Sequence, residues 1–508
     1  MEQSLSYFLG VDVGTSSCKV CVIDASGRTI GNAGYGYRTY SPADGWAEQE
    51  PSDWLVAVVR AVHKVIEETR IDPSRVRLLT LTSAAHIGVL ADGDGKPLRR
   101  AILWNDQRSS EEAQELANTH GELILARTFN RVSTTWTLSH LAWVRKHEPE
   151  VWRQVRRIYL SKDFIMQWLT GETSSDPATA LSSLLYDAVS HSWSEQLCEL
   201  AGFSPDILPT VRPANAVCGS LLPRIAHALH LPLGTPVVNG TLDSGAENYG
   251  AGACRPGDFV IRLGTAGGVH LVKSEPRPDP RLITYPHPVD RLWYSQAGTN
   301  AAGSSIAWAA NALGGMAEYT YAELIDMASR VPPGCDGLLF HPFLSGERCP
   351  YWDSLIRGNF SGISFRHGPG HFARAVMEGV VFSLKDAFLA IVEEAVQADN
   401  IRVVGGGIAN PLLTEILSDV LGRSLILLPQ ADSAYGAALL GFSMAEHEGS
   451  NTPCGRPEAG DSVRVLPRKA YQDIYEDAFA AYRDLCSHLQ AVYHAKPFRK
   501  FQERFQVQ

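Results

Sequence analysis

The feature that most constrains this chain is a pattern of strand, glycine-containing turn and strand that occurs twice, about half a chain apart. In the first copy, an apolar run at residues 8–13 leads into a turn at residues 14–16. In the second copy, an apolar run at residues 259–263 leads into a turn at residues 264–267. Short hairpins of this kind also recur by chance. The spacing nevertheless favours a duplicated lobe.

Helical patterns lie between and after these hairpins. Apolar residues at every fourth position form one stripe of a helix at Phe372, Val376, Val380, Leu384 and Phe388. Further helices are predicted at residues 136–147, 412–421 and 471–489. Strands that alternate with helices predict an α/β class with helices covering the sheets. Residues 448–461, rich in Gly and Pro, are predicted to form a surface linker, and residues 496–508 a peripheral tail.

Charge and hydropathy exclude several classes of protein. The net charge of −10 argues against a nucleic-acid binder, which needs a basic face. No apolar run is long enough to span a membrane, and the N-terminus, with Glu2, lacks the pattern of a signal peptide. The nine cysteines have no framework spacing, which predicts reduced thiols and a cytoplasmic location. Cys18 and Cys21 lie in a predicted strand, where small buried side chains are favoured over a redox or metal role.

The turn after the first strand has the chemistry of a phosphate site. Asp12 lies at the end of the strand, and Gly14, Thr15 and Ser16 offer backbone N–H and hydroxyl donors. Such a turn can hold phosphate oxygens, while the aspartate attracts the accompanying Mg²⁺. The alternative is a polar hairpin whose aspartate is satisfied by turn amides. Thr265, in the second hairpin, predicts a second phosphate loop.

A third glycine-rich corner follows the apolar run at residues 401–404. Its glycines, at residues 405–407, permit the close approach of a flat group such as adenine, although a strand-to-helix turn is the simpler alternative. The chain contains no G-x-x-x-x-G-K-[ST] motif, which excludes a P-loop nucleotide site.

Several further motifs carry a resemblance to a known family. They follow one another along the chain in the segments Asp12-x-Gly14-Thr15, 46–51, 104–108, 162–163, 344–348, 358–363 and 371–378. In kind and order these segments resemble the FGGY carbohydrate kinases, in particular their xylulokinase-like branch. The resemblance extends from residue 8 to about residue 445.

The resemblance implies an α/β, two-lobed, actin-like or ribonuclease H-like ATPase fold with the active site in the cleft between the lobes. It implies an N-terminal sugar-binding lobe at residues 1–250 and a C-terminal nucleotide-binding lobe at residues 251–446. Residues 447–508 would then form the linker, closing helix and tail. The implied substrates are ATP with Mg²⁺ and a small sugar or polyol, with neither nucleic acid nor membrane as a partner. A homodimer is compatible with the family.

The resemblance also implies roles for particular residues. Asp243 matches the family's general base; from the sequence alone it follows a buried strand and begins a helix, where an ordinary N-cap is the alternative. Asp12 would act on the metal. Phosphate and nucleotide contacts would come from Gly14, Thr15, Ser16, Thr265, Gly303, Gly406 and Asn410.

The candidate contacts to sugar hydroxyls are His86, Trp104, Asp106 and Arg108, together with Asp243. For His86 the alternative is a core histidine whose hydrogen bonds are satisfied internally, and for Arg108 it is an internal ion pair. Glu247, four residues after Asp243, shares its predicted helix face. A solvated glutamate is the favoured interpretation there.

The predicted sugar pocket departs from the typical xylulokinase. Ala84 and Ala85 replace Gln-Met, Ser244 replaces the Asn that follows the base, and the Arg-Glu of glycerol kinases is missing. We therefore expect a definite preference for one sugar, with a ketopentose favoured. A family kinase for another ketose, aldose or polyol stays open. An actin- or chaperone-like ATPase and an inactive sugar sensor are disfavoured by the sugar-side motifs and by the presence of both Asp12 and Asp243.

Overall fold

The computed structural model describes residues 6–317, 319–392, 401–446 and 462–503. The chain folds into two compact units, and each is built from segments that are distant in sequence. Unit 1 consists of Met1–Pro256, Val272–Tyr294 and Gln430–Gly460, and unit 2 of Gly257–Leu271, Ser295–Pro429 and Asp461–Gln508. The domain boundaries expected from the sequence remain predictions, and the linker expected at residues 448–461 lies outside the described residues.

Unit 1 is organised around a six-stranded sheet of order β13-β14-β5-β1-β2-β3. Strand β2 runs antiparallel to both of its neighbours, β1 and β3, whereas β5 and β14 run parallel to β1. The bounds are β1 Tyr7–Val13, β2 Ser17–Asp24, β3 Thr29–Gly36, β5 Val76–Ser83, β13 Val217–Ser220 and β14 Pro236–Leu242. The first predicted hairpin is therefore β1–β2.

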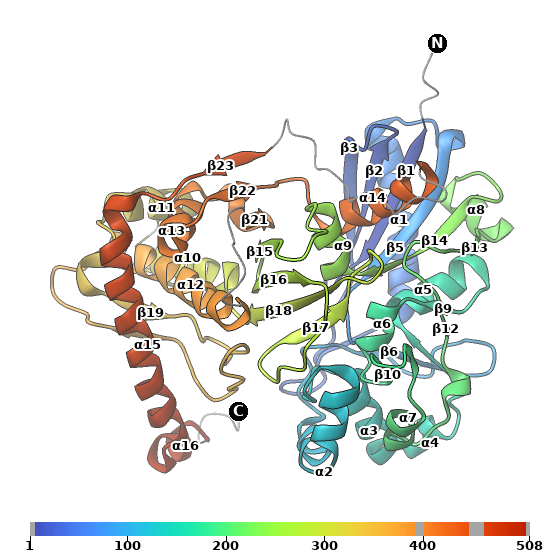
Figure 1. Ribbon diagram of the computed structural model, residues 1–508, viewed down its shortest axis with the longest axis horizontal. Helices are drawn as coiled ribbons and strands as arrows, with labels where there is room; N and C mark the ends of the chain where they lie inside the picture. Colours follow the sequence, from blue (N-terminus) through green and yellow to red (C-terminus); the bar gives the residue numbers. More distant parts are fainter. Residues whose placement is uncertain (1–5, 318, 393–400, 447–461, 504–508) are drawn as a thin grey trace. The chain divides into compact units, whose positions relative to one another are not determined.

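Alternation along β1 determines what lies on each face of this sheet. Leu9, Val11 and Val13 belong to the hydrophobic core that includes α1 (Pro51–Thr69). The residues between them, Gly10 and Asp12, face α14 (Ser433–Glu446), because successive side chains of a strand point to opposite faces. Only glycine fits at position 10, since a Cβ there would lie 1.9 Å from the carbonyl oxygen of Ala434. Figure 1 shows α14, from the C-terminal quarter of the sequence, beside the N-terminal strands.

The second sheet has the order β17-β18-β16-β15-β21-β22-β23. Here β15 pairs antiparallel with β16 and parallel with β21, which is parallel to β22; β23 is antiparallel to β22. The antiparallel pair β15–β16 therefore corresponds to the antiparallel pair β1–β2 of the first sheet. The parallel strands β21 and β22 likewise correspond to β5 and β14. The α/β two-lobed fold and its repeated hairpin are confirmed. The bounds are β15 Phe259–Leu263, β16 Gly267–Lys273, β17 Ile283–Pro286, β18 Trp293–Thr299, β21 Ile401–Val404, β22 Leu425–Leu427 and β23 Val463–Val465.

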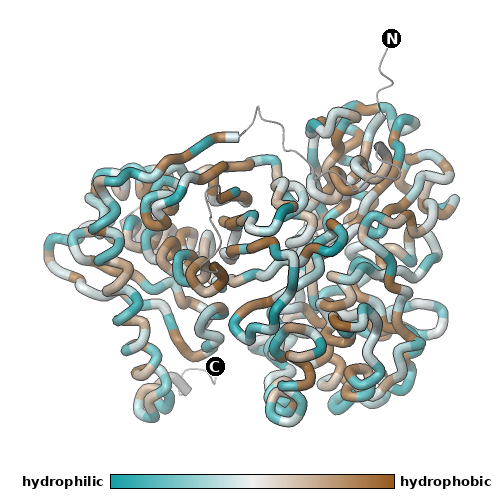
Figure 2. The backbone as a smooth tube through the Cα atoms, in the orientation of Figure 1, coloured by the Kyte–Doolittle hydropathy of each residue, from teal (hydrophilic) through white to brown (hydrophobic). Residues whose placement is uncertain are grey.

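The predicted helices are present. The apolar stripe forms the buried side of α12 (Pro369–Ile391), and the other predicted segments become α3 (Thr137–His147), α13 (Pro411–Leu421) and α15 (Gln472–His494). The described part of the tail forms α16 (Lys496–Glu503). Figure 2 shows hydrophobic stretches along the inner elements of each unit and hydrophilic residues on many outer loops.

The remaining helices and strands are short connections or cover the sheets. The helices are α2 Ser110–Thr128, α4 Pro149–Trp152, α5 Ser161–Thr170, α6 Pro177–Leu181, α7 Glu195–Ala201, α8 Pro223–Leu229, α9 Asp243–Gly250, α10 Gly303–Ala317 and α11 Tyr321–Ser329. The strands are β4 Glu48–Gln49, β6 Gly88–Ala91, β7 Ala101–Ile102, β8 Arg157–Leu160, β9 Ser174–Ser175, β10 Tyr186–Asp187, β11 Ser192–Trp193, β12 Thr210–Val211, β19 Leu339–His341 and β20 Asn359–Ser361.

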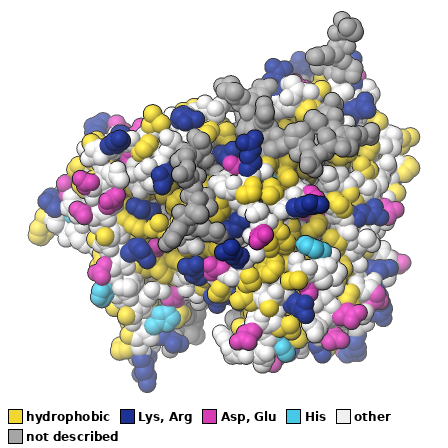
Figure 3. Space-filling model, in the orientation of Figure 1, with side chains coloured by type: hydrophobic (Ala, Val, Ile, Leu, Met, Phe, Trp, Pro, Cys, Tyr) yellow, Lys and Arg dark blue, Asp and Glu magenta, His cyan; other side chains and the backbone are white. Residues whose placement is uncertain are grey.

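The thiols agree with the sequence interpretation at most positions. Cys18 and Cys21 are free and buried in β2, and burial raises the pKa of Cys21 to about 12, so this thiol is unreactive. Cys254 is disulfide-bonded, so the expectation of reduced cysteines throughout is wrong at that position. Among the described helices, none is both long and apolar enough to cross a membrane. On the face drawn in Figure 3, Lys and Arg are scattered among Asp and Glu.

Candidate active site

Asp12 is a buried carboxylate on the α14 side of β1. Its Oδ2 accepts a 2.7 Å hydrogen bond from the hydroxyl of Ser433 at the start of α14. Within the described part of the chain, its Oδ1 has no hydrogen-bond partner. Burial and then the negative charge of Asp243 raise the Asp12 pKa to about 7, and Asp432 adds to the effect. A cation beside Oδ1 would satisfy this oxygen and lower the pKa.

The position of Asp12 fits Mg²⁺ that is carried by a nucleotide. Such an ion keeps several waters and is usually bound through one or two carboxylates plus the phosphates of the substrate. Among the residues that the structure describes, no cluster of three or more His, Cys, Asp or Glu could hold a metal ion. A single carboxylate with an uncommitted oxygen is the donor set that a nucleotide-bound ion needs.

The turn after β1 is held by donors that engage its carbonyl oxygens. Tyr37 donates through its hydroxyl to the carbonyl of Gly14 and through its amide to that of Ser16. Gln49 Nε2 donates to the Thr15 carbonyl at 2.6 Å, and Trp104 Nε1 donates to the Thr15 hydroxyl at 3.0 Å. Carbonyls that are engaged in this way repel an approaching anion less strongly than free ones. Trp104, predicted as a sugar contact, thus supports the predicted phosphate turn.

Asp243 is the first residue of α9, directly after β14. Its Oδ1 accepts a 2.7 Å hydrogen bond from the amide of Ser244, and the residue is partly exposed. The N-cap of this helix is Leu242, so Asp243 is the first helical residue and not the N-cap that the sequence offered as the alternative. Its charge raises the pKa of both Asp12 and Tyr294, which places the three side chains in one electrostatic neighbourhood. The positive end of the helix favours the ionised carboxylate.

His86 lies beyond the end of β5 and is 6% exposed, with φ +67°. Its Nδ1 lies 2.9 Å from the carbonyl oxygen of Ser182, and its Nε2 lies 3.0 Å from the hydroxyl of Tyr285. Because a carbonyl can only accept, Nδ1 carries the proton and Nε2 accepts from Tyr285. Trp136 packs edge-on against the ring. These contacts match the alternative of a satisfied core histidine, and the substrate contact of His86 stays a prediction.

Arg108 and Asp106 form an internal ion pair. Arg108 binds both carboxylate oxygens of Asp106, at 2.9 and 2.8 Å, and also contacts Glu48 at 2.6 Å. Its guanidinium lies 3.8 Å from the ring centroid of Trp46, and neither side chain of the pair is exposed. Their donors and acceptors are committed to the protein. We therefore propose no direct substrate contact for Asp106 or Arg108.

Two interpretations next to the site change with the structure. Glu247 is 5% exposed, so the expectation of a solvated glutamate is wrong; residues 244–250 of α9 are all buried, because this helix packs on α14 and β14. Ala84 belongs to the hydrophobic core, whereas Ala85 is half-buried. Only Ala85 is therefore accessible enough to enlarge a pocket.

The residues predicted to contact the nucleotide in unit 2 come together around the end of β15. The amide of Gly303 donates to the Gly264 carbonyl at 2.9 Å, and the amide of Ser304 donates to the Thr265 carbonyl at 3.1 Å. A Cβ at position 303 would lie 2.7 Å from the Gly264 oxygen, so glycine permits this approach. Gly406 leaves open space around its Cα.

Asn410 has a structural task at the edge of this region. Its side chain caps α13 by accepting a 3.2 Å hydrogen bond from the amide of Leu413. It thereby fixes the corner that contains Gly406. A direct nucleotide contact of Asn410 remains a prediction.

Sequence reasoning missed several polar residues near Asp12 and Asp243. Asp432 precedes α14 and Ser433 is its first residue, and Asp432 Oδ1 accepts a hydrogen bond from the amide of Tyr435 at 2.9 Å. Tyr294 lies 2.8 Å from the hydroxyl of Ser244. The Asp-Ser pair at a helix start is a capping pattern that could have drawn attention to residues 432–433. No local pattern marks Tyr294.

The comparisons with known proteins identify the family of the chain. Two models of the FGGY family of carbohydrate kinases match the chain, the N-terminal domain at residues 7–250 and the C-terminal domain at residues 259–445. The chain is 34% identical to the xylulose kinase of Lactococcus lactis over 433 residues, 84% of this chain and 85% of that one. It is 28% identical to the gluconokinase of Bacillus subtilis, with 94% of each chain covered. The solved xylulose kinase of Rhodospirillum rubrum superposes with a TM-score of 0.86 at 28% identity, covering 96% of this chain and all of that one.

The fold and these matches define a phosphotransferase that acts on an alcohol group, with the two-lobed actin-like architecture. The chain belongs to the FGGY family of carbohydrate kinases. It is thus an ATP-dependent carbohydrate kinase.

Proposed function

We propose that the chain transfers the γ-phosphoryl group of MgATP to a hydroxyl of a small neutral sugar, favouring a ketopentose such as xylulose. Asp243 accepts the proton of the attacking hydroxyl, and Asp12 holds Mg²⁺ directly or through water. The observation that carries the proposal is the placement of these two carboxylates at one edge of the sheet. Asp12 and Thr241, which lies two residues before Asp243, both pair with Thr82 of β5, and the charge of Asp243 raises the pKa of Asp12.

The chemistry of the transfer assigns different tasks to the two carboxylates. A γ-phosphoryl group passes through a loose transition state, so catalysis depends on positioning and charge stabilisation. Asp243, partly exposed at a helix N-terminus, is suited to stay ionised and to accept a proton. Asp12 is buried, and the cation that ATP brings would offset its unfavourable charge. Mg²⁺ supplies neutralisation of the phosphate charge when bound.

Phosphate and nucleotide contacts are proposed on both units. In unit 1, the turn formed by Gly14, Thr15 and Ser16 offers the hydroxyls and amides of Thr15 and Ser16, whereas the amide of Gly14 donates to the Ser17 carbonyl at 3.1 Å. In unit 2, Thr265 and Gly303 line a second turn, and the open corner at Gly406 accommodates the nucleoside. Asn410 fixes that corner through its cap on α13.

The choice of a neutral acceptor rests on charge. The carboxylates of Asp12 and of the buried Glu247 lie near Asp243, and Asp432 adds negative charge near Asp12. A sugar acid would bring a further negative charge into this environment, which disfavours its binding. The similarity to xylulose kinases, at 34% identity, favours a ketopentose over other neutral sugars.

ADP release measured over a panel of pentuloses, hexuloses, polyols, aldoses and gluconate tests this proposal. We expect the largest kcat/KM with a pentulose and a much smaller value with gluconate. Asp243→Asn is the control and should abolish sugar-dependent release. A preference for gluconate would overturn the neutral-acceptor proposal, and ATP turnover that is indifferent to every sugar would contradict the sugar-kinase chemistry.

A further inference from the structure

A second polar cluster lies inside unit 1, between α5 and β14, and its centre is a lysine. Lys162, the second residue of α5, has a side chain with no solvent exposure. Its Nζ donates to the backbone carbonyl of Asn239 at 3.1 Å and to Asn239 Oδ1 at 3.0 Å. Asp176 Oδ1 lies 3.4 Å from Nζ and Asp163 Oδ1 lies 3.7 Å away. Burying an ammonium group is costly, so a residue kept there must be fully engaged.

Lys162 binds β14 at the point where this strand is irregular. The pairing of β14 with β5 shifts register between Val238 and Thr241. Gly240, within the shift, has φ +70°, and a Cβ there would lie 1.5 Å from the Leu81 carbonyl oxygen, so only glycine is possible. The shift turns the Asn239 carbonyl out of the ladder towards Lys162. Asp243 begins its helix three residues after Gly240.

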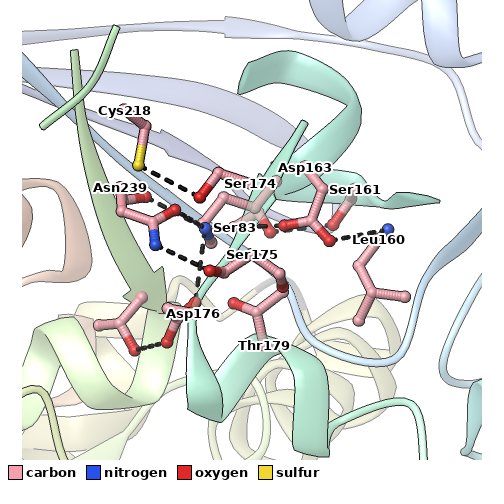
Figure 4. A network of polar contacts seen from close by, with 12 residues as sticks. Ser83, Leu160, Ser161, Asp163, Ser174, Ser175, Asp176, Thr179, Cys218 and Asn239 are labelled. Atoms are coloured by element: carbon pink, nitrogen blue, oxygen red, sulfur yellow. Dashed lines mark hydrogen bonds and ion pairs between the residues drawn. The ribbon is translucent and has the colours of Figure 1, made fainter. Parts of the chain in front are cut away.

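The partners of Lys162 are themselves fixed on several sides. Asn239 Nδ2 donates to the carbonyls of Ser175, Arg212 and Pro213, at 2.9, 3.0 and 3.2 Å. Asp176 caps α6 through the amide of Ala178 and accepts a 2.9 Å hydrogen bond from the hydroxyl of Thr241. Figure 4 shows Asp163, Asp176 and Asn239 directed towards one another from separate segments of the chain.

We propose that Lys162 is a positioning residue for Asp243. It binds the bulge of β14 through Asn239, and it contacts Asp176, which accepts a hydrogen bond from Thr241. These contacts fix the end of β14, so that the side chain of Asp243 is held in one orientation. Both contacts, that of Lys162 with Asn239 and that of Asp176 with Thr241, act within the four residues that precede Asp243. The inference rests on the proposed function, in which Asp243 accepts the proton.

The test compares Lys162→Met with the wild type. Methionine keeps the length of the side chain and removes the charge and the donors. We expect kcat to fall by about 10- to 100-fold, because small misplacements of a catalytic group have effects of this size, while the KM for ATP stays unchanged. Ser174→Ala is the matched control, since Ser174 is buried at the rim of the cluster and contacts Cys218. It should keep the kcat of the wild type.

A double-mutant cycle separates positioning from general destabilisation. Thr241→Val removes the hydrogen bond to Asp176 at almost constant volume and should lower kcat less than Lys162→Met does. The two changes should combine less than additively, because they loosen the same segment. If Lys162→Met does not fold, Thr241→Val alone decides. A folded variant of either residue with the kcat of the wild type, or a parallel rise in the KM for ATP, overturns the inference.

The same experiment distinguishes failure of the inference from failure of the proposed function. If the wild type phosphorylates a sugar and Asp243→Asn does not, the proposed base stands whatever Lys162 does. If Asp243→Asn keeps its activity, the proposed function fails first, and the positioning role fails with it.

Discussion

The two hairpins that repeat in this chain have the same backbone plan and opposite charge. When Gly14-Thr15 is aligned with Gly264-Thr265, Asp12 of β1 corresponds to Arg262 of β15. Asp12 is buried beside further acidic groups, and its pKa is raised to about 7. Around Arg262 the environment is basic: burial, then Arg262 and Arg348, lower the pKa of His270 to about 3. The strand before one turn thus carries a group suited to a cation, and the strand before the other carries a group suited to an anion.

The difference explains how a duplicated element acquires two tasks. A strand–turn–strand unit supplies backbone donors at both sites, whereas the residue two positions before the glycine determines which charge is attracted. We therefore expect both turns to contribute to phosphate binding, with the metal dependence arising from Asp12 in unit 1 and an additional positive charge for the phosphates from Arg262 in unit 2.

Among the changes that test this difference between the two hairpins, removal of the Asp12 carboxylate should have the largest effect on activity. For Asp12→Asn we expect kcat/KM to fall by about 10²- to 10³-fold, because the metal contributes several kcal/mol to stabilisation of the transition state. The loss should be partly recovered at high Mg²⁺ concentration. Asp24→Asn, at the other end of the β1–β2 hairpin, is the control and should retain the activity of the wild type. An equal loss of kcat/KM in both variants would contradict a specific role of Asp12 in metal binding.

The same substitution, which lowers activity, should raise the stability of the fold at high pH. The Asp12 pKa is raised in the folded state, so its contribution to stability is present below the unfolded pKa of about 3.8 and is lost as pH rises through about 7. Asp12→Asn should therefore melt at a higher temperature than the wild type at pH 8, without Mg²⁺ or ATP, and the difference should vanish near pH 4. Thermal unfolding over this range checks it; a variant less stable than the wild type at pH 8 would contradict the charge burial.

A smaller effect is expected at the basic hairpin. Arg262→Gln should raise the KM for ATP by about 10-fold, as expected for one charge-assisted hydrogen bond, and leave the Mg²⁺ dependence unchanged. Arg402→Gln is the matched control, because Arg402 lies on the adjacent strand β21 and pairs with Asp258. Steady-state kinetics with varied ATP give the answer. An unchanged KM in Arg262→Gln would mean that the basic environment serves only the fold.

The smallest effect concerns the support of the unit 1 turn. Trp104→Phe removes the 3.0 Å hydrogen bond to the Thr15 hydroxyl and keeps an aromatic ring. We expect a rise of about threefold to fivefold in the KM for ATP, the size of one neutral hydrogen bond. If the KM for the sugar changes instead, Trp104 contacts the acceptor, as the sequence predicted.

Local patterns revealed much of the fold and part of the site. The hairpin turn with Asp12, the helix start at Asp243 and the stripe of α12 are each encoded by neighbouring residues. The contact between Asp12 and Ser433 joins residues 421 positions apart, and that between His86 and Tyr285 joins residues 199 positions apart. No periodicity encodes such pairs. Glu247 was misjudged for the same reason, since its burial depends on α14.

The arrangement of Lys162 illustrates a further limit. The dipeptide Lys162-Asp163 was recognised as a motif, yet its sequence reveals neither the bulge at Gly240 nor the grip on Asn239. Those contacts depend on how α5 packs beside β14. The sequence motif therefore pointed to Lys162, but only the folded structure showed that Lys162 binds Asn239.

The central claim is that Asp243 accepts the proton of the acceptor hydroxyl. Rapid-quench measurement of a single turnover, with ATP and enzyme in excess over the preferred sugar, tests it directly. The account predicts that Asp243→Asn slows phosphoryl transfer by about 10²- to 10⁴-fold, the usual contribution of a general base, while the affinity for ATP is retained. A transfer rate within a few-fold of the wild type, with ATP bound equally well, would contradict it.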